Sequence, residues 1–419
     1  MHIKDLNGKK VCILGFGQEG QAVLRAIAKY APNTKITIAD KKSEARSSKS
    51  ETVSDFDIRI SDFVAGEDYL QNLDQFDIII KSPGIPPCPE LTAVGIHVTN
   101  TTQIFLDTIA GSGATVIGVT GSKGKSTTAS LIHAILAMAK KDVHLVGNIG
   151  DPAIDHLEDI TNHTIFVMEM SSYQLLHTTT SPHIAVIVSF FPEHLDYHQS
   201  MEAYREAKRN IVRFQKAEDI VIFNAQAPDV LEIAGASPGV KVPFTEDDAP
   251  VTLKETHLIG AHNLFNIAAA SKTAESLQID QKIIKKAICA FKGLPHRLQN
   301  LGKHHGITWV DDSISTTPES AIAALEALGA DVATMLLGGQ DRGNDFAKLG
   351  EHIAKSNVKH VILFPPSGVR IQQAIQRAQA TVQCHAVTNM KEAVSIAREV
   401  TPQGKTCLLS PASPSYGLF

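Results

Sequence analysis

Short apolar runs alternate with helical patterns through the first hundred residues. The run KVCILGFG ends in glycines, and EGQAVLRAIAKY, which follows it, has apolar residues at helical spacing. TKITIAD and FDIIIKSPG are two further runs of strand length. Such runs between helices are typical of a parallel sheet that helices cover on both faces. We therefore expect a doubly wound, Rossmann-like sheet in this part of the chain.

The same alternation continues to the end of the chain. In the middle, the pattern predicts strands at ATVIGVTG, VHLV, TIFVMEMS, HIAVIVSF and DIVIFN, and helices at STTASLIHAILAMA and MEAYREAKRNIVRFQ. After GLPHRLQ, it predicts strands at GITWVDDS, TMLLGG, HVILFP and TCLLS, and helices at ESAIAALEAL and MKEAVSIAREV. We therefore expect an α/β protein of three domains, at residues 1–100, 101–297 and 298–419.

Composition and charge exclude several classes of protein. The 419 residues carry 39 Lys and Arg against 44 Asp and Glu, whereas nucleic-acid binders usually have a basic surplus. The apolar runs are too short to cross a bilayer, and MHIKDLNGKKVCILGFG lacks the apolar core of a signal peptide. We expect a cytosolic monomer that binds neither nucleic acid nor membranes. Its five scattered cysteines, without a CxxC pair, are expected to be reduced, buried thiols.

The stretch GVTGSKGKSTTASL, from Gly118 to Leu131, has the composition of a phosphate-binding loop between a strand and a helix. Backbone N–H groups at such a helix start bind phosphate oxygens, a lysine reaches the terminal phosphates and a hydroxyl ligates Mg²⁺. The strict motif requires glycine where Val119 stands, so the spacing is a variant. We expect ATP to bind at Gly121, Ser122, Lys123, Gly124, Lys125, Ser126 and Thr127.

A second glycine fingerprint, GFGQEG, follows the first predicted strand. Its Gly15, Gly17 and Gly20 fit G-x-G-x-x-G, and Asp40 follows about twenty residues later. Alone, this pattern predicts a dinucleotide-dependent dehydrogenase. No motif for a redox partner follows in the sequence, so that interpretation stays an alternative.

Two polar residues stand at the ends of predicted strands in the middle domain, Glu169 in MEMSSYQL and His194 in FFPEHLDYH. Carboxyl ends of parallel strands meet at one edge of a sheet, so both side chains can lie near Lys125. Mg²⁺ prefers carboxylate and water oxygens, which suits Glu169. The alternative interpretation is a solvated glutamate and a turn histidine.

Several motifs occur together in a fixed order, and together they resemble those of the Mur ligases, the amino-acid-adding enzymes of bacterial peptidoglycan synthesis. They are VTGSKGKSTT, GNIG, E-x-S-S-x-Q-L, H-L-D, Y-x-x-A-K and H-N-x-x-N. The resemblance implies an ATP- and Mg²⁺-dependent ligase that adds glutamate, in the D form, to UDP-N-acetylmuramoyl-L-alanine through an acyl phosphate. Its partners would be these small-molecule substrates, and the third domain would move toward the second during the reaction.

The resemblance also implies roles for residues of the middle domain. Lys125, His194 and Lys208 would be catalytic, with Lys208 carbamylated. By its helical spacing Lys208 is an ordinary amphipathic lysine, and composition alone indicates a solvent-facing side chain. Mg²⁺ would be held by Ser126, Glu169, His194 and the carbamylated Lys208. ATP would also contact Asn263, Asn266, Arg297 and Asp312, although the helix start at His262 could equally serve as a cap and core segment.

In the Mur ligases a Rossmann-like first domain holds the UDP part of the muramyl substrate, so the two glycine loops would serve different ligands. The residues that match this site are Gly17, Gln18, Glu19, Asp40, Lys41, Ser82, Gly84 and Asn148.

The third segment resembles the glutamate-adding branch of the family. In WVDDSISTTPESAIAAL and the later LLGGQDRGNDF and SPASPSYGLF, the residues at glutamate-binding positions are Thr316, Arg342, Ser415 and Phe419. Ile314 replaces a family lysine, which removes a cation beside phosphate. Family members continue through a further helix after this point, so we expect the third domain to be truncated.

Three alternatives remain open. A closely related ligase would add L-glutamate or act on another acid, as folylpolyglutamate synthetase does, and a substrate panel separates these. A nicotinamide-dependent oxidoreductase would transfer hydride without using ATP. A nucleotide-binding module without chemistry would bind ATP tightly and release no phosphate.

Overall fold

The computed structural model describes residues 1–42, 60–93, 95, 97–158 and 160–415. The chain divides into two compact units, one of Met1–Pro250 with Leu264–Ile288 and one of Val251–Asn263 with Cys289–Phe419. The α/β fold is confirmed: each of the three predicted domains contains one sheet. The exact domain boundaries stay a prediction.

The first sheet is parallel, with the strand order β3-β2-β1-β4-β5. Its central strands are nearly continuous apolar runs because helices and loops cover both faces. The predicted β1, β2 and β4 are confirmed, whereas the edge strands β3 and β5 were not predicted. The strand bounds are β1 Lys10–Leu14, β2 Lys35–Asp40, β3 Ile60–Ala65, β4 Ile78–Lys81 and β5 His97–Thr99.

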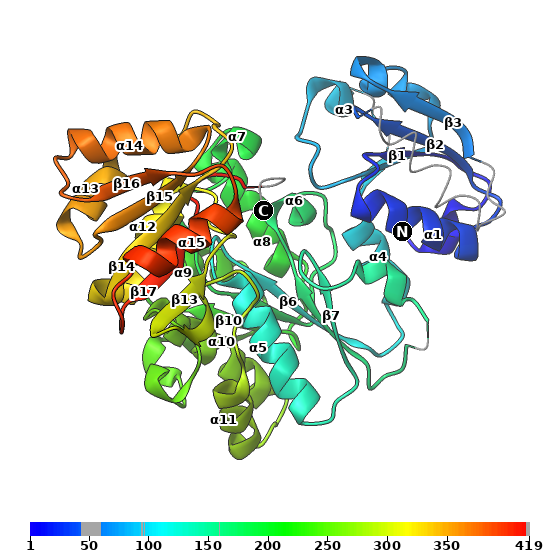
Figure 1. Ribbon diagram of the computed structural model, residues 1–419. Coiled ribbons are helices and arrows are strands. Elements are labelled where there is room, and N and C mark those ends of the chain that lie inside the picture. Colours follow the sequence, from blue (N-terminus) through cyan, green and yellow to red (C-terminus); the bar gives the residue numbers. More distant parts are fainter. Residues whose placement is uncertain (43–59, 94, 96, 159, 416–419) are drawn as a thin grey trace. The chain divides into compact units, whose positions relative to one another are not determined.

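The middle sheet is also parallel, in the order β11-β10-β9-β6-β8-β7. Strand β6 therefore lies between β8 and β9, at the centre of the sheet. Figure 1 labels its strands β6, β7 and β10. The pattern predicted all of these strands except the edge strand β11. The bounds are β6 Thr115–Thr120, β7 Val143–Gly147, β8 Ile165–Glu169, β9 Ile184–Ile187, β10 Ile220–Asn224 and β11 Val240–Phe244.

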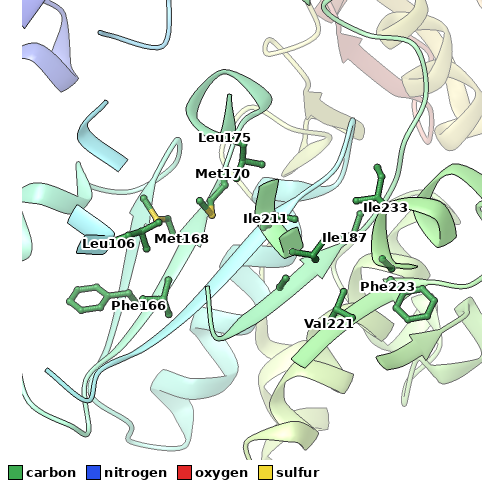
Figure 2. Close-up of a cluster of buried hydrophobic side chains, with 14 of the residues drawn as sticks. Leu106, Phe166, Met168, Met170, Leu175, Ile187, Ile211, Val221, Phe223 and Ile233 are labelled. Carbon is green, nitrogen blue, oxygen red and sulfur yellow. The ribbon is translucent and has the colours of Figure 1, made fainter. Parts of the chain in front are cut away.

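The core of the middle domain lies between its strands and two of its helices. Figure 2 labels core members from β8, β9 and β10 together with Ile211 of α8 (Met201–Arg213) and Ile233 of α9 (Pro228–Gly235). The rings of Phe105 and Phe166 meet edge to face, with centroids 5.1 Å apart. This packing fixes where each strand ends, and therefore where the polar residues after it stand.

The third sheet has the order β12-β13-β17-β14-β15-β16, and its one antiparallel pair is β12 with β13. The predicted strands β13, β14, β15 and β17 form its interior, and the two edge strands were not predicted. The bounds are β12 Gln299–His304, β13 Ile307–Asp311, β14 Val332–Gly338, β15 His360–Phe364, β16 Gln383–Ala386 and β17 Thr406–Leu409.

Helix α12 (Pro318–Leu328) begins where the sequence supplies a cap. Thr317 accepts a hydrogen bond from the backbone N–H of Ser320, and Pro318 occupies the first turn, where its missing N–H costs nothing. The remaining helices are α1 Gln18–Tyr30, α3 Pro89–Ala93, α4 Thr101–Ile109, α5 Lys125–Met138, α6 Ser172–Leu175, α7 Leu195–His198, α10 His262–Ser276, α11 Gln281–Ala290, α13 Ala347–Lys355, α14 Ser367–Arg377 and α15 Met390–Val400.

The five cysteines are free thiols. Cys12 and Cys407 are buried, and burial raises the pKa of each thiol to about 12. Cys88, Cys289 and Cys384 are only half-buried, so the expectation that all five are buried was wrong. Among the described residues, no helix combines the length and apolar character needed to cross a bilayer.

The first glycine loop requires two of its glycines for different reasons. Gly15 has φ +91°, and a Cβ there would lie 2.8 Å from the Cβ of Ser82. Gly20 lies in the first turn of α1, and a Cβ there would lie 2.2 Å from the carbonyl oxygen of Gly15. A Cβ at Gly17 would have open space. Helix α1 thus approaches β1 closely at Gly20.

The Gly20→Ala substitution should therefore destabilise the first sheet by roughly 1–3 kcal/mol, because the added methyl group overlaps backbone that cannot move away. Gly17→Ala is the matched control, with a smaller expected effect. Hydrogen exchange of peptides from residues 10–30 measures the opening free energy of this segment. Equal protection in the two variants would show that the close approach at Gly20 does not exist.

Candidate active site

Four neighbouring strands of the middle sheet end at one edge. The register aligns Val119 of β6 and Gly147 of β7 with Glu169 of β8, and Thr120 of β6 with Ile187 of β9. The residues that follow these strands therefore gather at a common edge, as ligand sites do in open α/β sheets. They include the predicted ATP loop, Glu169, and the segment that leads to His194.

The predicted phosphate loop has the expected strand–loop–helix context. Gly124 has φ +86°, a conformation that favours glycine, and directly precedes α5. A Cβ on Gly124 would lie 2.4 Å from Oδ1 of Asn266, and the Thr128 hydroxyl donates to the same Oδ1 at 3.2 Å. Asn266, predicted to contact ATP, therefore packs against the loop itself.

The segment after β9 supports the loop from its other side. Ser122 N–H donates to the carbonyl oxygen of Ser189 at 2.9 Å, and Lys123 N–H donates to the Ser189 hydroxyl at 3.0 Å. The Ser122 hydroxyl oxygen accepts from the N–H of Phe191 at 2.9 Å, and Lys123 Nζ lies 2.5 Å from a carboxylate oxygen of Glu193. These contacts hold the loop in one conformation.

Two lysines converge on the loop carbonyls. Lys125 Nζ donates to the carbonyl oxygens of Gly121 at 2.9 Å and Ser122 at 2.8 Å. Lys208 Nζ donates to the same Gly121 oxygen at 2.9 Å and to the Thr120 hydroxyl at 3.3 Å. Both lysines thus donate to the Gly121 carbonyl oxygen, and the predicted metal-binding role of Lys208 stays a prediction.

Lys208 is buried, with only 1% of its surface exposed, so the interpretation of a solvent-facing lysine was wrong. The helical spacing indicates the burial of Lys208, because Lys208 lies on the same buried stripe of α8 as Tyr204 and Ile211. Burial lowers the pKa of Lys208 well below its usual range, and the positive charge of Lys125 lowers it further. The neutral amine is therefore favoured.

Glu169 is buried as well, which overturns the interpretation of a solvated glutamate. One carboxylate oxygen accepts from the Asn148 amide at 3.0 Å, and the other is buried without a hydrogen-bond partner in the described part of the chain. A buried carboxylate oxygen without a donor fits a cation. Asn148 is thus placed beside Glu169, and its predicted contact with the UDP-linked substrate stays a prediction.

The oxygen donors of Glu169 and Ser126 suit Mg²⁺ only if oxygens from phosphate or water complete its coordination. Within residues 1–42, 60–93, 95, 97–158 and 160–415, no cluster of three His, Cys, Asp or Glu side chains is arranged to hold a metal ion. Mg²⁺ commonly combines one or two carboxylates with phosphate and water oxygens. Glu169, with the hydroxyl of Ser126 in the first turn of α5, fits such a partial set.

His194 stands between the loop and a group of aromatic rings. It has φ +59° and directly precedes α7; its ring centroid lies 5.0 Å from that of Tyr173. Its Nε2 lies 3.7 Å from a Glu193 oxygen. Burial lowers the pKa of His194, the negative charge of Glu193 raises it, and the positive charge of Lys125 lowers it further. A neutral imidazole can ligate a metal or accept a proton.

Most residues predicted for the UDP site lie where β1, β2 and β4 end. The Asp40 carboxylate accepts from the N–H of Phe16 at 2.6 Å, and the Ser82 hydroxyl donates to the Gly15 carbonyl at 2.9 Å. Lys41 pairs with Glu67 at 3.4 Å. This arrangement connects the three loops that contain the predicted residues Gly17, Gln18, Asp40, Lys41, Ser82 and Gly84.

Glu19 differs from its neighbours in this loop. Its carboxylate accepts hydrogen bonds from the Thr101 hydroxyl and, at 3.3 Å, from the Gln174 amide. Burial raises its pKa. Glu19 is predicted to line the UDP site, but its side chain is directed to Thr101 and Gln174. Its backbone N–H, in the first turn of α1, is the group that can face an anion.

Three of the residues predicted to contact ATP lie in the second unit: Asn263, Arg297 and Asp312. Asp312 is buried and accepts from the N–H of Leu298 at 3.1 Å and the hydroxyl of Ser410 at 2.9 Å; burial raises its pKa. The Nε of Arg297 is buried without a hydrogen-bond partner among the described residues. The Asn263 amide donates to the Ile259 carbonyl at 2.8 Å. Their contacts with ATP stay predictions.

The loops predicted to hold glutamate adjoin one another within the second unit. Ala412 N–H donates to the carbonyl oxygen of Ser315 at 2.9 Å, and Gln340 N–H donates to that of Pro414 at 2.7 Å. These bonds bring together the loops that contain Thr316, Arg342 and Ser415; Phe419 lies outside the described residues. Ile314, at the position of a family lysine, has 50% of its surface exposed.

Comparisons with known proteins agree with this arrangement. Residues 119–249 match the family model "Mur ligase middle domain", and residues 296–413 match "Mur ligase, glutamate ligase domain". The chain is 34% identical to the UDP-N-acetylmuramoyl-L-alanine--L-glutamate ligase of Salinispora tropica, over 100% of this chain and 96% of that protein. The chain belongs to the Mur ligase family.

Other relatives of this Mur ligase are named as ligases for D-glutamate rather than L-glutamate. The chain is 33% identical to the UDP-N-acetylmuramoylalanine--D-glutamate ligase of Symbiobacterium thermophilum, over 98% of this chain and 94% of that protein. Among solved structures, MurF of Acinetobacter baumannii has a TM-score of 0.63 at 17% identity, covering 96% of this chain and 87% of that one. MurF of Thermotoga maritima in complex with ADP has a TM-score of 0.59 at 17% identity, covering 99% and 93%. At 17% identity, these two structures show a similarity of fold alone.

Replacing Lys125 with alanine should abolish ATP turnover by this Mur ligase, with a loss of about 10²–10³-fold or more, since one donor to the transferring phosphoryl group is lost. UDP binding should be unchanged, because the first glycine loop lies on a different sheet. Calorimetric titration with UDP and a phosphate-release assay measure the two effects, with Lys285→Ala on the exposed face of α11 as the control. An equal loss of ATP turnover and UDP binding would contradict the assignment of the two glycine loops to different ligands.

Proposed function

We propose that this Mur ligase joins glutamate to UDP-N-acetylmuramoyl-L-alanine, with ATP as the activating substrate. The observation that carries the proposal is the convergence of Lys125 and Lys208 on the Gly121 carbonyl, beside the buried Glu169. The names of the relatives support the choice of substrates. The cytosol, where ATP is available, is the proposed compartment, and the monomer is the proposed state.

In the first step, the terminal carboxylate of the muramyl substrate attacks the γ-phosphorus of ATP. A carboxylate oxygen–phosphorus bond forms, the bond to the bridging oxygen breaks, and ADP leaves. Lys125 and the N–H groups of the loop and first helical turn stabilise the charge on the phosphoryl oxygens. The product is an acyl phosphate, in which the former carboxylate carbon is electrophilic.

Four side chains are proposed to hold Mg²⁺: Ser126, Glu169, His194 and a carbamylated Lys208. When bound, Mg²⁺ neutralises charge on the phosphate oxygens. Glu169 supports this assignment because one of its buried oxygens lacks a donor.

The buried amine of Lys208 supports its carbamylation. Only the neutral amine attacks CO₂, forming a nitrogen–carbon bond and releasing a proton, and the depressed pKa favours that neutral form. The carbamate would be an anion facing Lys125, so it would remove the repulsion between two adjacent ammonium groups. It would also supply the second carboxylate-like group that the described cluster of acidic side chains lacks.

In the second step, the amine of glutamate attacks the acyl carbon. A tetrahedral intermediate forms, the carbon–oxygen bond to the phosphate breaks, and inorganic phosphate leaves as the amide forms. His194, with its lowered pKa, is proposed to position the reacting groups or to accept a proton from the amine. The loops of Thr316, Arg342 and Ser415 are proposed to hold the glutamate, with Arg342 facing its side-chain carboxylate.

The direct test is phosphate release from ATP with UDP-N-acetylmuramoyl-L-alanine, Mg²⁺ and either D- or L-glutamate. We expect release to depend on all three substrates and mass spectrometry to show one added glutamyl residue. The sequence prediction is D-glutamate, whereas relatives carry both enantiomers in their names, so each enantiomer is assayed separately. Phosphate release that needs no muramyl substrate, or none with either enantiomer, would refute the proposal.

Replacing Lys208 with alanine should lower kcat about 10–100-fold, because the carbamate ligand is lost. A short carboxylate such as acetate should restore part of the activity by replacing the missing anion. Lys208→Arg keeps the positive charge and should not respond to acetate. A Lys208→Ala variant with full activity, or one that acetate leaves unchanged, would count against carbamylation.

Replacing Arg342 with alanine should raise the KM for glutamate about tenfold or more, equivalent to the roughly 1.5–3 kcal/mol of a hydrogen bond to a charged group. The KM for ATP should stay within about twofold of that of the wild type, because the ATP loop lies in the other unit. Steady-state kinetics with each substrate varied in turn measure this, with the exposed Arg377→Ala on α14 as the control. An unchanged KM for glutamate would remove Arg342 from the site.

A further inference from the structure

A buried lysine stands at the end of β4, away from the ATP loop. Lys81 has 2% of its surface exposed, and its hydrogen-bond partners in the described part of the chain are neutral oxygens. Nζ donates to the carbonyl of Ile85 at 2.6 Å and to the hydroxyl of Tyr197 at 3.0 Å. Burial lowers the pKa of Lys81 to about 8. A buried amine without a carboxylate partner is costly, so its position calls for a specific reason.

Tyr197, from α7, completes the arrangement. Its hydroxyl lies 3.0 Å from the carbonyl oxygen of Pro83 and 2.8 Å from that of Ile85, while it accepts from Lys81. The carbonyls of the turn at residues 82–85 are therefore bound by two side chains. One comes from the first sheet and one from the middle domain, both within the first compact unit.

The same turn lies against the first glycine loop. Its Ser82 hydroxyl donates to the Gly15 carbonyl at 2.9 Å, and its N–H donates to the carbonyl of Leu14. Ser82 and Gly84 are two of the residues proposed to line the UDP site. Whatever fixes this turn therefore also fixes one wall of that site.

On its other side, Tyr197 packs toward the catalytic segment. The Tyr173 ring centroid lies 4.2 Å from that of Tyr197 and 5.0 Å from that of His194. His198 stacks on Tyr173 and lies 5.3 Å, between centroids, from Tyr204. The hydroxyl oxygen of Tyr204 lies 3.1 Å from that of Ser122 in the ATP loop. A continuous series of ring contacts thus leads from Tyr197, which binds the turn at residues 82–85, to Tyr204, which contacts the ATP loop.

We propose that Lys81 and Tyr197 are positioning residues that fasten the turn at residues 82–85 to the segment carrying His194. This inference rests on the proposed function: the nucleotide end of the muramyl substrate would bind at the turn while its carboxylate reacts near His194. Lys81 and Tyr197 would then set the distance between the bound nucleotide end of the substrate and its reacting carboxylate. Neither side chain needs to touch the reacting atoms.

A polar pair of this kind is better suited to placing groups than to stabilising the fold. Apolar residues of similar volume often stabilise a protein as well as a buried polar pair does. Orientation is different, because a misplacement of about 1 Å can cost roughly 10²-fold in rate. Loss of the pair should therefore affect turnover more than folding.

The kinetic test compares Tyr197→Phe, Lys81→Met and the double variant. Tyr197→Phe keeps the ring against Tyr173 and removes only the hydroxyl. We expect kcat to fall about 10–100-fold in each single variant, with the KM for ATP within about twofold of that of the wild type. The double variant should be no slower than the slower single variant, because both act through one contact. Tyr30→Phe, at the end of α1, is the control and should behave as the wild type.

A second measurement needs no activity. Hydrogen exchange of the ligand-free protein should become faster in both segments, residues 78–91 and 194–204, in each single variant, although the mutated residue lies in only one of them. Faster exchange in the mutated segment alone would overturn the link. Kinetics that match those of Tyr30→Phe, or a lowered thermal midpoint with kcat unchanged, would overturn the positioning role. If the wild type has no ligase activity, the proposed function fails, and the exchange data still decide whether the segments are linked.

Discussion

Two lysine side chains donate to one carbonyl oxygen, that of Gly121, and the site depends on this contact. Two ammonium groups so close to one another repel, and the fully buried Lys208 is the one whose charge is disfavoured. The local excess of positive charge can be relieved by phosphate oxygens, by conversion of Lys208 to a carbamate, or by both. Glu169 is buried, and one of its carboxylate oxygens has no hydrogen-bond donor among the residues that the structure describes. This distribution of charge suits the proposed binding of ATP together with Mg²⁺.

The parallel sheets make this concentration of charge possible. Because β7, β8, β6 and β9 are neighbours and run in one direction, the residues after them come from distant parts of the sequence to one edge. The first sheet repeats the principle with its own glycine loop, where Asp40 and Ser82 bind backbone groups of the first loop. One fold element used twice gives two candidate anion sites, one for the proposed UDP end of the muramyl substrate and one for ATP. In the second unit, the loops after β13, β14 and β17 adjoin in the same way.

The interior strands and the edge strand β7 could be predicted from the sequence, whereas the other edge strands could not. Interior strands such as β1, β6 and β14 are covered on both faces and read as continuous apolar runs. The missed strands β3, β5, β11, β12 and β16 all lie at sheet edges, where polar residues interrupt the pattern. At the candidate site, motif order singled out the loop, Glu169 and Lys208 for roles that stay predictions. The i, i+4 spacing of Lys208 from Tyr204 could also have indicated that Lys208 is buried. The carboxylate of Glu19 and the amide of Asn148 bind partners far away in sequence, Gln174 and Glu169, which local patterns do not reveal.

The central claim is that a substrate carboxylate takes the γ-phosphoryl group of ATP at the Lys125 loop. The most direct measurement uses UDP-N-acetylmuramoyl-L-alanine whose terminal carboxylate is labelled with oxygen-18, followed by mass spectrometry of the released phosphate. An acyl phosphate passes one carboxylate oxygen to phosphorus, so each phosphate released with amide formation should contain one labelled oxygen. Unlabelled phosphate, formed at the same rate as the amide, would contradict the account, because the carboxylate would then not have attacked phosphorus.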